Sequence, residues 1–225
     1  MLSLGNFYFA LSSAAKSDSQ LKDSYKFFYH VLNENHSNAY AANGLGMVCV
    51  EKREIEAARE IFSKAREANV PMSEDICTNL AHVYLLQNRL VDAERLYQAT
   101  IKSLSQTGST SSDSLVSINE YVSYAQFSNS RHQEAIKSLL IAAHLNPTNL
   151  RLWYNIAFVG EAYCTNLIEK SMTDFNTADG AGQILAMSKK LFKALALPQS
   201  QTSQKVYDRK LASIHSASCV VWKHN

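Results

Sequence analysis

The chain has 225 residues, of which 46% are hydrophobic and 19% are charged, a composition typical of a folded globular protein rather than a disordered one. Its 22 basic and 20 acidic residues give a net charge of +2 without a cluster of Lys or Arg, which argues against direct nucleic-acid binding. No apolar run approaches the roughly 18 residues that a membrane-spanning helix needs, so we expect no membrane partner.

The first 38 residues are interpreted as an incomplete structural repeat. Their apolar start, ahead of the small residues 13–15, could be taken for a secretion signal. However, it lacks a positive charge, and Gly5 and Asn6 interrupt the apolar core. Gly5, Tyr8 and, after an enlarged turn, Phe28 fit a repeat instead. A secreted or organellar repeat protein, which would require cleavage of this segment, is kept as an alternative.

Residues 39–200 contain four further copies of one pattern. In the first copy, Ala58 lies twelve residues after Gly46, Phe62 four residues later and Ala65 three residues later, the spacing of a tetratricopeptide repeat. Pro147 ends the third copy where this repeat places a proline. The matching residues of the later copies are Ala81, Tyr84, Ala93 and Tyr97; Ser123, Ala135, Leu139 and Ala142; and Trp153, Ile156 and Ala157. We therefore predict an all-α fold, a right-handed α-solenoid of about four to five helix-turn-helix repeats.

The copies divide the chain into repeats near residues 1–38, 39–73, 74–115, 116–149 and 150–200. Two inserts are predicted: a Ser/Thr/Gly-rich surface loop over 105–114, and a segment over 171–182 between the two helices of the last repeat. Residues 201–225 are predicted to form a capping helix or the first helix of another repeat.

Small residues at the position of Gly46 are expected to let the two helices of a repeat approach closely. The large side chain four residues after Ala58 or Ala93 would then fill the space beside this contact.

The first helices of stacked repeats are expected to line a concave inner face that binds a partner. We predict that this face consists mainly of aromatic and asparagine side chains: Tyr40, Asn43, Gly44, Met47, Asn79, His82, Tyr121, Tyr124, Arg151, Tyr154, Asn155 and Phe158.

These residue types suit an extended protein segment. Asparagine both donates to and accepts from a peptide backbone, and tyrosine supplies a large, rigid contact area. Gly44 would let the backbone of that segment approach closely. Alternatively, the Tyr and Asn side chains pack against the next helix, and His82 is a satisfied groove or core residue. The inner-face positions contain no pair of basic residues that could bind the terminal carboxylate of a peptide. This argues against a chaperone-binding repeat.

No catalytic motif is present. The chain contains no HExxH, GxGxxG, Walker or GxSxG pattern, and its histidines show no metal-ligand spacing. Cys49, Cys77, Cys164 and Cys219 lie far apart and are interpreted as small buried hydrophobic residues. We therefore predict a non-enzymatic protein without cofactor or metal, whose partners are protein subunits or extended peptide segments.

Six stretches of the chain carry a more specific resemblance: residues 40–46 (YAANGLG), 57–68, 79–84, 140–147, 155–157 and 191–196. They resemble the large tetratricopeptide-repeat scaffold subunits of the RNA polymerase II-associated factor complex. The resemblance implies a nuclear scaffold that holds the other subunits together and supports transcription elongation and co-transcriptional histone modification.

The chain departs from that family in length. Family members are several times longer, so the resemblance implies that this chain is a fragment or a partial gene product. The Ser/Thr-rich segment after Leu104 is also longer than the corresponding connection in the family. A general tetratricopeptide adaptor, in protein targeting, a ubiquitin ligase or another assembly in the cytoplasm, remains the alternative.

Overall fold

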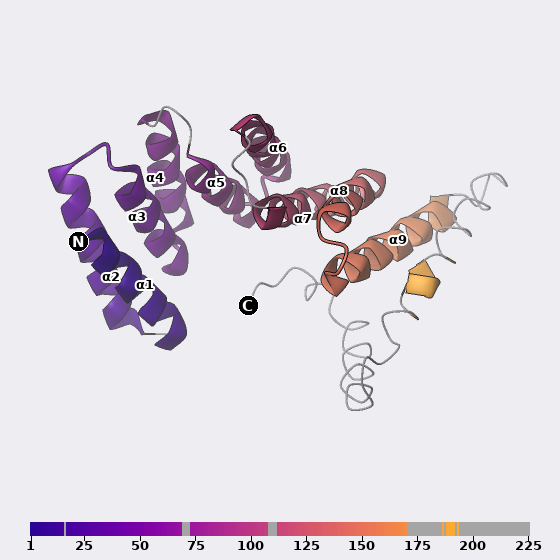
Figure 1. Cartoon of the computed structure of the whole chain (residues 1–225), viewed down its shortest axis with the longest axis horizontal. Coiled ribbons are helices and arrows are strands. Elements are labelled where there is room, and N and C mark those ends of the chain that lie inside the picture. Colours follow the sequence, from indigo (N-terminus) through magenta and orange to yellow (C-terminus); the bar gives the residue numbers. More distant parts are fainter. Residues whose placement is uncertain are drawn as a thin grey trace. The chain divides into compact units, whose positions relative to one another are not determined.

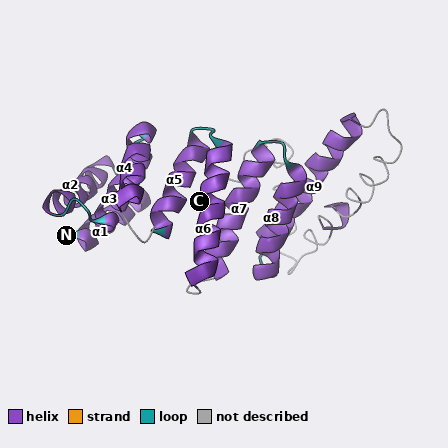
Figure 2. Cartoon of the chain, turned by 90° about the horizontal axis from the view of Figure 1, so that it is seen from above, coloured by secondary structure: helices purple, strands orange, loops and turns teal. Residues whose placement is uncertain are grey.

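The computed structural model describes residues 1–15, 17–68, 73–107 and 112–170, together with positions 186, 188–191 and 193. The helices are α1 (Leu2–Ala15), α2 (Asp18–Glu34), α3 (Ala39–Glu51), α4 (Ile55–Ala68), α5 (Glu74–Leu86), α6 (Leu90–Thr107), α7 (Ser112–Ser128), α8 (His132–Leu145) and α9 (Leu150–Lys170) (Figure 1). Loops and turns join the helices, and no strand occurs among the described residues (Figure 2). No helix in this part of the chain is long and apolar enough to cross a membrane.

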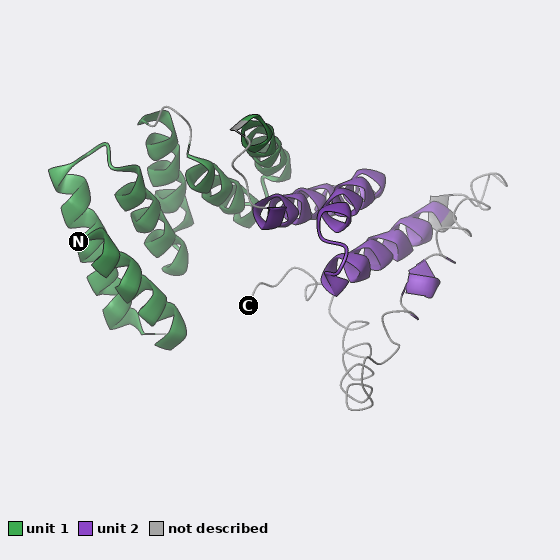
Figure 3. Ribbon diagram, viewed as in Figure 1, with its two compact units in different colours: residues 1–110 green, residues 111–225 purple. Residues whose placement is uncertain are grey.

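The chain divides into two compact units (Figure 3). Unit 1 is Met1–Thr110 and contains α1 to α6. Unit 2 is Ser111–Asn225 and contains α7 to α9. The two units are described separately below.

Unit 1 consists of three helix-turn-helix pairs, α1–α2, α3–α4 and α5–α6. The second helix of a pair also packs against the first helix of the next pair, α2 on α3 and α4 on α5. The first helices contact one another in order, α1 with α3 and α3 with α5. The pairs within this unit therefore stack as the sequence repeat predicts.

A glycine and an aromatic ring form the contact inside the α3–α4 pair. A Cβ atom built on Gly46 would lie 2.5 Å from the ring of Phe62, so no side chain fits between the two helices there. Ala58 and Phe62 are both fully buried on α4, and Ala93 and Tyr97 are fully buried on α6. This confirms the predicted small-against-large contact. The residues at the position of Gly46 in the later copies, Ala81, Ser123 and Ala157, are fully buried as well.

The α1–α2 pair corrects one expectation from the sequence. Phe28 follows Gly5 by 23 residues, whereas Phe62 follows Gly46 by 16 residues. The seven additional residues do not enlarge the turn, because α1 continues ten residues beyond Gly5 instead of five, and α2 begins ten residues before Phe28 instead of seven. The connection itself is one residue shorter. Since seven residues make about two helical turns, Gly5 and Phe28 still face each other.

The turn between the two helices has the same geometry in three pairs. Arg53, Asn88 and Ser130 adopt the left-handed conformation, with φ angles of 61°, 58° and 60°. In each turn, the backbone N–H of the following residue donates to the carbonyl five residues earlier, from Glu54 to Cys49, from Arg89 to Tyr84 and from Arg131 to Gln126. This bond satisfies a carbonyl at the helix end, as in a Schellman-type C-cap.

Unit 2 contains the α7–α8 pair, and α9 packs on α8. Its apolar core is formed by Val116, Ala135, Leu139, Ala142, Ala143, Leu152, Ile156 and Val159. Helix α8 ends at Leu145, two residues before Pro147, where the repeat pattern places the helix end. After this turn, the side chain of Asn149 accepts a hydrogen bond from the N–H of Arg151 at 3.1 Å, and Asn38 caps α3 in a similar way.

The segment predicted as a Ser/Thr-rich loop is largely helical at both ends. Helix α6 runs through Thr107 and α7 begins at Ser112, so only residues 108–111 of the expected 105–114 loop lie outside the described residues. Asp113 in the first turn of α7 favours an early helix start through its charge. The 171–182 insert and the 201–225 helix also lie outside the described residues. The repeat boundaries therefore stay a prediction.

Candidate partner-binding surface

The asparagines predicted on the inner face of unit 1 bond to each other. The Nδ2 of Asn79 on α5 donates to the Oδ1 of Asn43 on α3 at 2.8 Å, and both side chains are half-buried. The Nδ2 of Asn43 also lies 4.0 Å from the sulfur of half-buried Met47. These amides link neighbouring first helices, which is the packing alternative drawn from the sequence.

Gly44 does not open the inner face to a peptide, contrary to the expectation. It is buried, and a Cβ atom at this position would lie 2.4 Å from the ring of Phe28, which reaches over from α2. The same ring lies 2.7 Å from a Cβ atom built on Gly5. Two glycines on neighbouring first helices therefore enclose one phenylalanine, and the absence of a side chain at Gly44 is needed for this packing.

His82 is satisfied inside the α5–α6 pair. Its Nδ1 lies 2.5 Å from the hydroxyl of Tyr97, and the two rings meet edge to face at 5.5 Å. This agrees with the interpretation of His82 as a satisfied residue rather than a ligand-binding one. Tyr40, by contrast, is 76% exposed and is the most open of the predicted inner-face residues in unit 1.

A charged pair links the first helices of unit 2. The guanidinium of Arg151 on α9 donates to the carboxylate of Glu120 on α7 at 2.5 Å. The Glu120 side chain is 9% exposed, whereas the Arg151 side chain is 55% exposed. The predicted site includes Arg151 but not Glu120, although the opposite charges at these positions of the two predicted first helices indicate such a pair.

Three tyrosines follow this pair along the sequences of α7 and α9. Tyr121, Tyr124 and Tyr154 are half-buried on α7 and α9. Burial raises the pKa of the Tyr121 hydroxyl, with a further rise from Glu120 and an opposing effect from Arg151. The tyrosine hydroxyl therefore stays protonated at neutral pH and can donate a hydrogen bond.

Asn155 is not part of an accessible surface. It is 1% exposed, on the stretch of α9 that also buries Ile156 and Ala157. The expectation that its amide contacts a peptide is therefore wrong. The core of unit 2 extends further around α9 than the repeat position alone indicates.

A second contact joins α7 and α9. The rings of Phe127 and Phe158 lie 5.7 Å apart at 52°, and both side chains are partly buried against the unit 2 core. Phe127 follows Glu120 by seven residues, and Phe158 follows Arg151 by seven. The ionic and aromatic contacts therefore lie about two helical turns apart, or about 10 Å along the helices.

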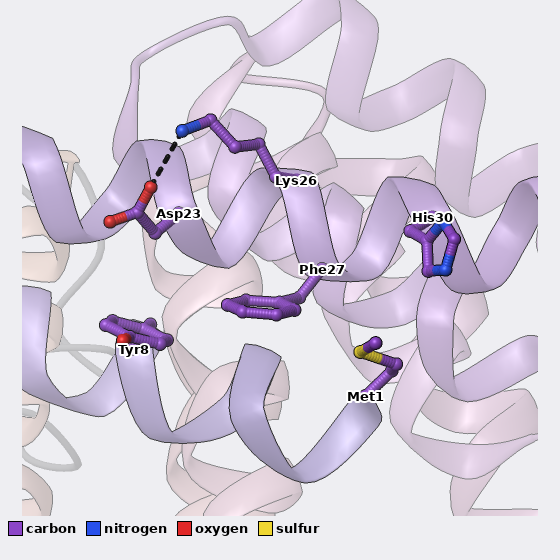
Figure 4. Close-up of a pocket in the computed structure, with 6 residues that line it drawn as sticks. All are labelled: Met1, Tyr8, Asp23, Lys26, Phe27 and His30. Carbon is purple, nitrogen blue, oxygen red and sulfur yellow. Dashed lines mark hydrogen bonds and ion pairs between the residues drawn. The ribbon is translucent and has the colours of Figure 1, made fainter.

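A pocket of about 310 Å³ lies between α1 and α2 (Figure 4). Tyr8 and Phe27 stack within it at 5.5 Å, and Asp23 pairs with Lys26 at 2.9 Å. Met1 and His30 complete the lining. The sequence pattern gave no indication of this pocket. Its largely apolar walls could accept an apolar side chain.

The three cysteines described by the structure, Cys49, Cys77 and Cys164, are buried. Burial raises the pKa of Cys49, Cys77 and Cys164, which keeps these thiols protonated and unreactive. This confirms the expected role of the three residues as small hydrophobic groups, while Cys219 lies outside the described part. The described residues contain no group of His, Cys, Asp and Glu that could hold a metal ion.

The stacked helix pairs and their small-against-aromatic contacts define the fold class, and the expected all-α solenoid of tetratricopeptide repeats is confirmed. The solved structure of YrrB, described as a TPR protein with an unusual peptide-binding site, superposes with a TM-score of 0.55. The likeness covers 82% of this chain and 89% of that chain at 21% sequence identity, and shows the fold alone.

Two sequence relatives of the chain are named CTR9. The chain is 26% identical to the protein CTR9 homolog of Arabidopsis thaliana over 97% of its length, and 26% identical to the RNA polymerase-associated protein CTR9 of Caenorhabditis elegans over 71%. It spans 20% and 14% of the length of these two relatives. The resemblance to the scaffold subunit of the polymerase-associated factor complex is thereby confirmed. No family model matches the chain.

Proposed function

We propose that this chain is a non-enzymatic scaffold segment of the RNA polymerase II-associated factor complex. It acts in the nucleus, where it holds other subunits together and supports transcription elongation and co-transcriptional histone modification. The similarity to the CTR9 homolog of Arabidopsis thaliana over 97% of the chain is the observation that carries this proposal. The stacked helix pairs support it, because such an array offers a long surface to partner chains.

The partner surface that we propose is the accessible part of the inner face. In unit 2 it comprises Tyr121, Tyr124, Arg151, Tyr154 and Phe158, with Arg151 the most exposed charge. In unit 1 it comprises Tyr40, which is exposed, and the half-buried Asn43, Met47 and Asn79. An extended protein segment fits aromatic side chains of this kind, and neither nucleic acid nor membrane is an expected direct partner.

Affinity capture of the tagged protein from its own cells, with cross-linking and mass spectrometry, tests this function. We expect recovery of RNA polymerase II and of the other complex subunits, with cross-links to α3, α5, α7 and α9. Recovery of targeting receptors or ligase subunits instead would contradict the role in transcription. A nuclear position of the tagged protein is a further expected result.

The alternative is a general tetratricopeptide adaptor that binds an extended peptide in another assembly. The fold motivates this second candidate, because YrrB, which shares it, is described as a TPR protein with a peptide-binding site. The same capture experiment separates the two functions, because an adaptor would recover partners unrelated to polymerase.

A further inference from the structure

We propose that Arg151 anchors an acidic side chain of the bound partner segment, and that Phe127 and Phe158 bind an apolar side chain about three residues away from it. This proposal rests on the proposed scaffold function, and it names the partner chemistry of the unit 2 inner face. The bound segment is an extended peptide carrying an acidic residue and an apolar residue at that spacing.

The first step concerns the charge that a partner meets. Glu120 is 9% exposed and faces Arg151, whereas over half of the Arg151 side chain is accessible. The carboxylate is therefore largely hidden, and the guanidinium is the charged group presented to an approaching segment. A guanidinium carries five N–H donors in a planar fork, so it can bind Glu120 and a second carboxylate at once.

The second step concerns positioning. Glu120 holds the guanidinium at 2.5 Å, which restricts the rotamers of Arg151 before any partner arrives. A side chain that is already ordered loses less entropy on binding. Glu120 thus acts as a positioning residue, and Arg151 makes the contact with the partner.

The third step concerns the spacing along the helices. The aromatic contact between Phe127 and Phe158 lies seven residues after the ionic contact on both α7 and α9. This separation of about 10 Å equals roughly three residues of an extended chain. Tyr121, Tyr124 and Tyr154 occupy the helical turns between the two contacts. A single extended segment can therefore reach both of them.

Single-stranded RNA also binds surfaces of arginine and aromatic side chains, but it needs a basic groove that follows the phosphates. On this face Arg151 is paired with Glu120, and half-buried Glu161 lies ten residues further along α9. One exposed, already paired cation does not make such a groove. The surface chemistry therefore favours a protein segment.

Selection from a displayed library of random twelve-residue peptides on the whole chain tests the proposal. We expect enriched peptides to contain Asp or Glu about three residues from an aromatic or aliphatic residue. Synthetic, fluorescein-labelled copies then give affinities by anisotropy, and amide replacement of the acidic residue should weaken binding about tenfold. Enrichment without an acidic residue, or no enrichment at all, would overturn the proposal.

Variants of the chain locate the contact. Arg151→Gln should lower the affinity about tenfold and abolish the preference for the acid over its amide, while Arg151→Lys should retain part of that preference. Lys137→Gln, which removes an exposed cation from α8, is the matched control and should change nothing. Equal binding by the Arg151→Gln and Lys137→Gln variants would refute the anchor.

Glu120→Gln separates positioning from direct contact. It should weaken binding about threefold but leave the preference for the acidic peptide intact, an effect that general destabilisation would not produce. Circular dichroism and melting confirm that each variant is folded. Preferential, Arg151-dependent binding of a fluorescein-labelled U12 RNA over the peptides would also overturn the proposal.

The anchor and the scaffold function fail in different ways. Suppose that the Arg151→Gln variant still captures the polymerase subunits and that the library shows no preference for acidic peptides. The role of Arg151 as an anchor is then refuted, and the scaffold function stands. If peptides bind in an Arg151-dependent way but the chain captures no polymerase subunit, the proposed function in transcription is refuted and the role of Arg151 as an anchor stands.

Discussion

The two units connect their neighbouring first helices in different ways. In unit 1, the amide of Asn79 donates to that of Asn43, and two neutral groups satisfy each other. In unit 2, Arg151 pairs with a nearly buried Glu120 and keeps over half of its own side chain accessible. Inner-face positions therefore stabilise the stack in one unit and present a charge in the other. The position of a residue in the repeat determines which face of the helix its side chain lies on. The neighbouring side chains determine whether a partner can contact it.

The largest effect on unit 1 should come from Phe28→Ala. The ring is 1% exposed and fills the space between Gly5 and Gly44, so its loss should destabilise the unit by about 3 to 5 kcal/mol. Urea unfolding gives the free energy, and amide exchange should show lost protection in α1 to α4 but not in α7 to α9. Phe7→Ala, at a side chain that is 58% exposed, is the control. Equal loss of amide protection in both units would contradict the assignment of the Phe28 packing to unit 1 alone.

Gly44→Ala distinguishes packing from peptide access. Because a Cβ atom would lie 2.4 Å from the Phe28 ring, we expect a loss of about 1 to 3 kcal/mol in the free energy of unfolding. Thermal melting measures the loss, and adding Phe28→Leu should recover part of it. A normal melting temperature with impaired partner binding would restore the original interpretation of Gly44 as a peptide contact.

Asn79→Ala should have a smaller effect on stability. It leaves the half-buried Asn43 amide without its partner, at a cost of about 1 kcal/mol. A double-mutant cycle with Asn43→Ala in urea unfolding should give a coupling energy of similar size. Peptide binding at unit 2 should not change. Strictly additive losses would show that the two amides do not support each other.

The last effect is absent at neutral pH and appears only at alkaline pH. Burial raises the pKa of Cys49 and Cys77 above the ordinary value of 9.0, so unfolding exposes thiols that ionise more readily. Stability should be constant below about pH 9 and should then fall as pH rises, by less than about 1.4 kcal/mol per pH unit for each thiol. Urea unfolding between pH 7 and 10.5 measures this slope.

A matched variant isolates the thiols. Both proteins to be compared carry Cys219→Ser. The one that also carries Cys77→Ala should have a lower free energy of unfolding at neutral pH, but this free energy should fall less steeply as the pH rises above 9. An unchanged slope would assign the decline to other groups, among them Tyr121, whose pKa is also raised.

The spacing of small and large residues was sufficient to predict most of the helical fold. Gly46 and Phe62 were recognised as a contact because their separation recurs as Ala81 with Tyr97 and Ser123 with Leu139. Such contacts are set by the geometry of one helix pair, so a single repeat contains the information. The burial of all these residues follows from the same geometry.

Contacts between repeats are harder to predict from the sequence. Gly44 is buried by Phe28, a residue of the preceding pair whose unusual distance from Gly5 concealed its position in the stack. Asn155 was assigned to the open face, yet the core of unit 2 encloses it. The Glu120–Arg151 pair depends on the axial offset between α7 and α9. A repeat pattern predicts this offset only to within about one helical turn.

The longer α1–α2 pair offers a practical opportunity. Relative to their equivalents in α3 and α4, α1 gains five residues after Gly5 and α2 gains three before Phe28, so the added turns extend the pair at its tip by about 4.5 to 7.5 Å. The contact at Gly5 lies well away from that tip. A fluorophore or a short epitope inserted between Ala15 and Asp18 should therefore report on the protein without disturbing the packing that holds unit 1 together.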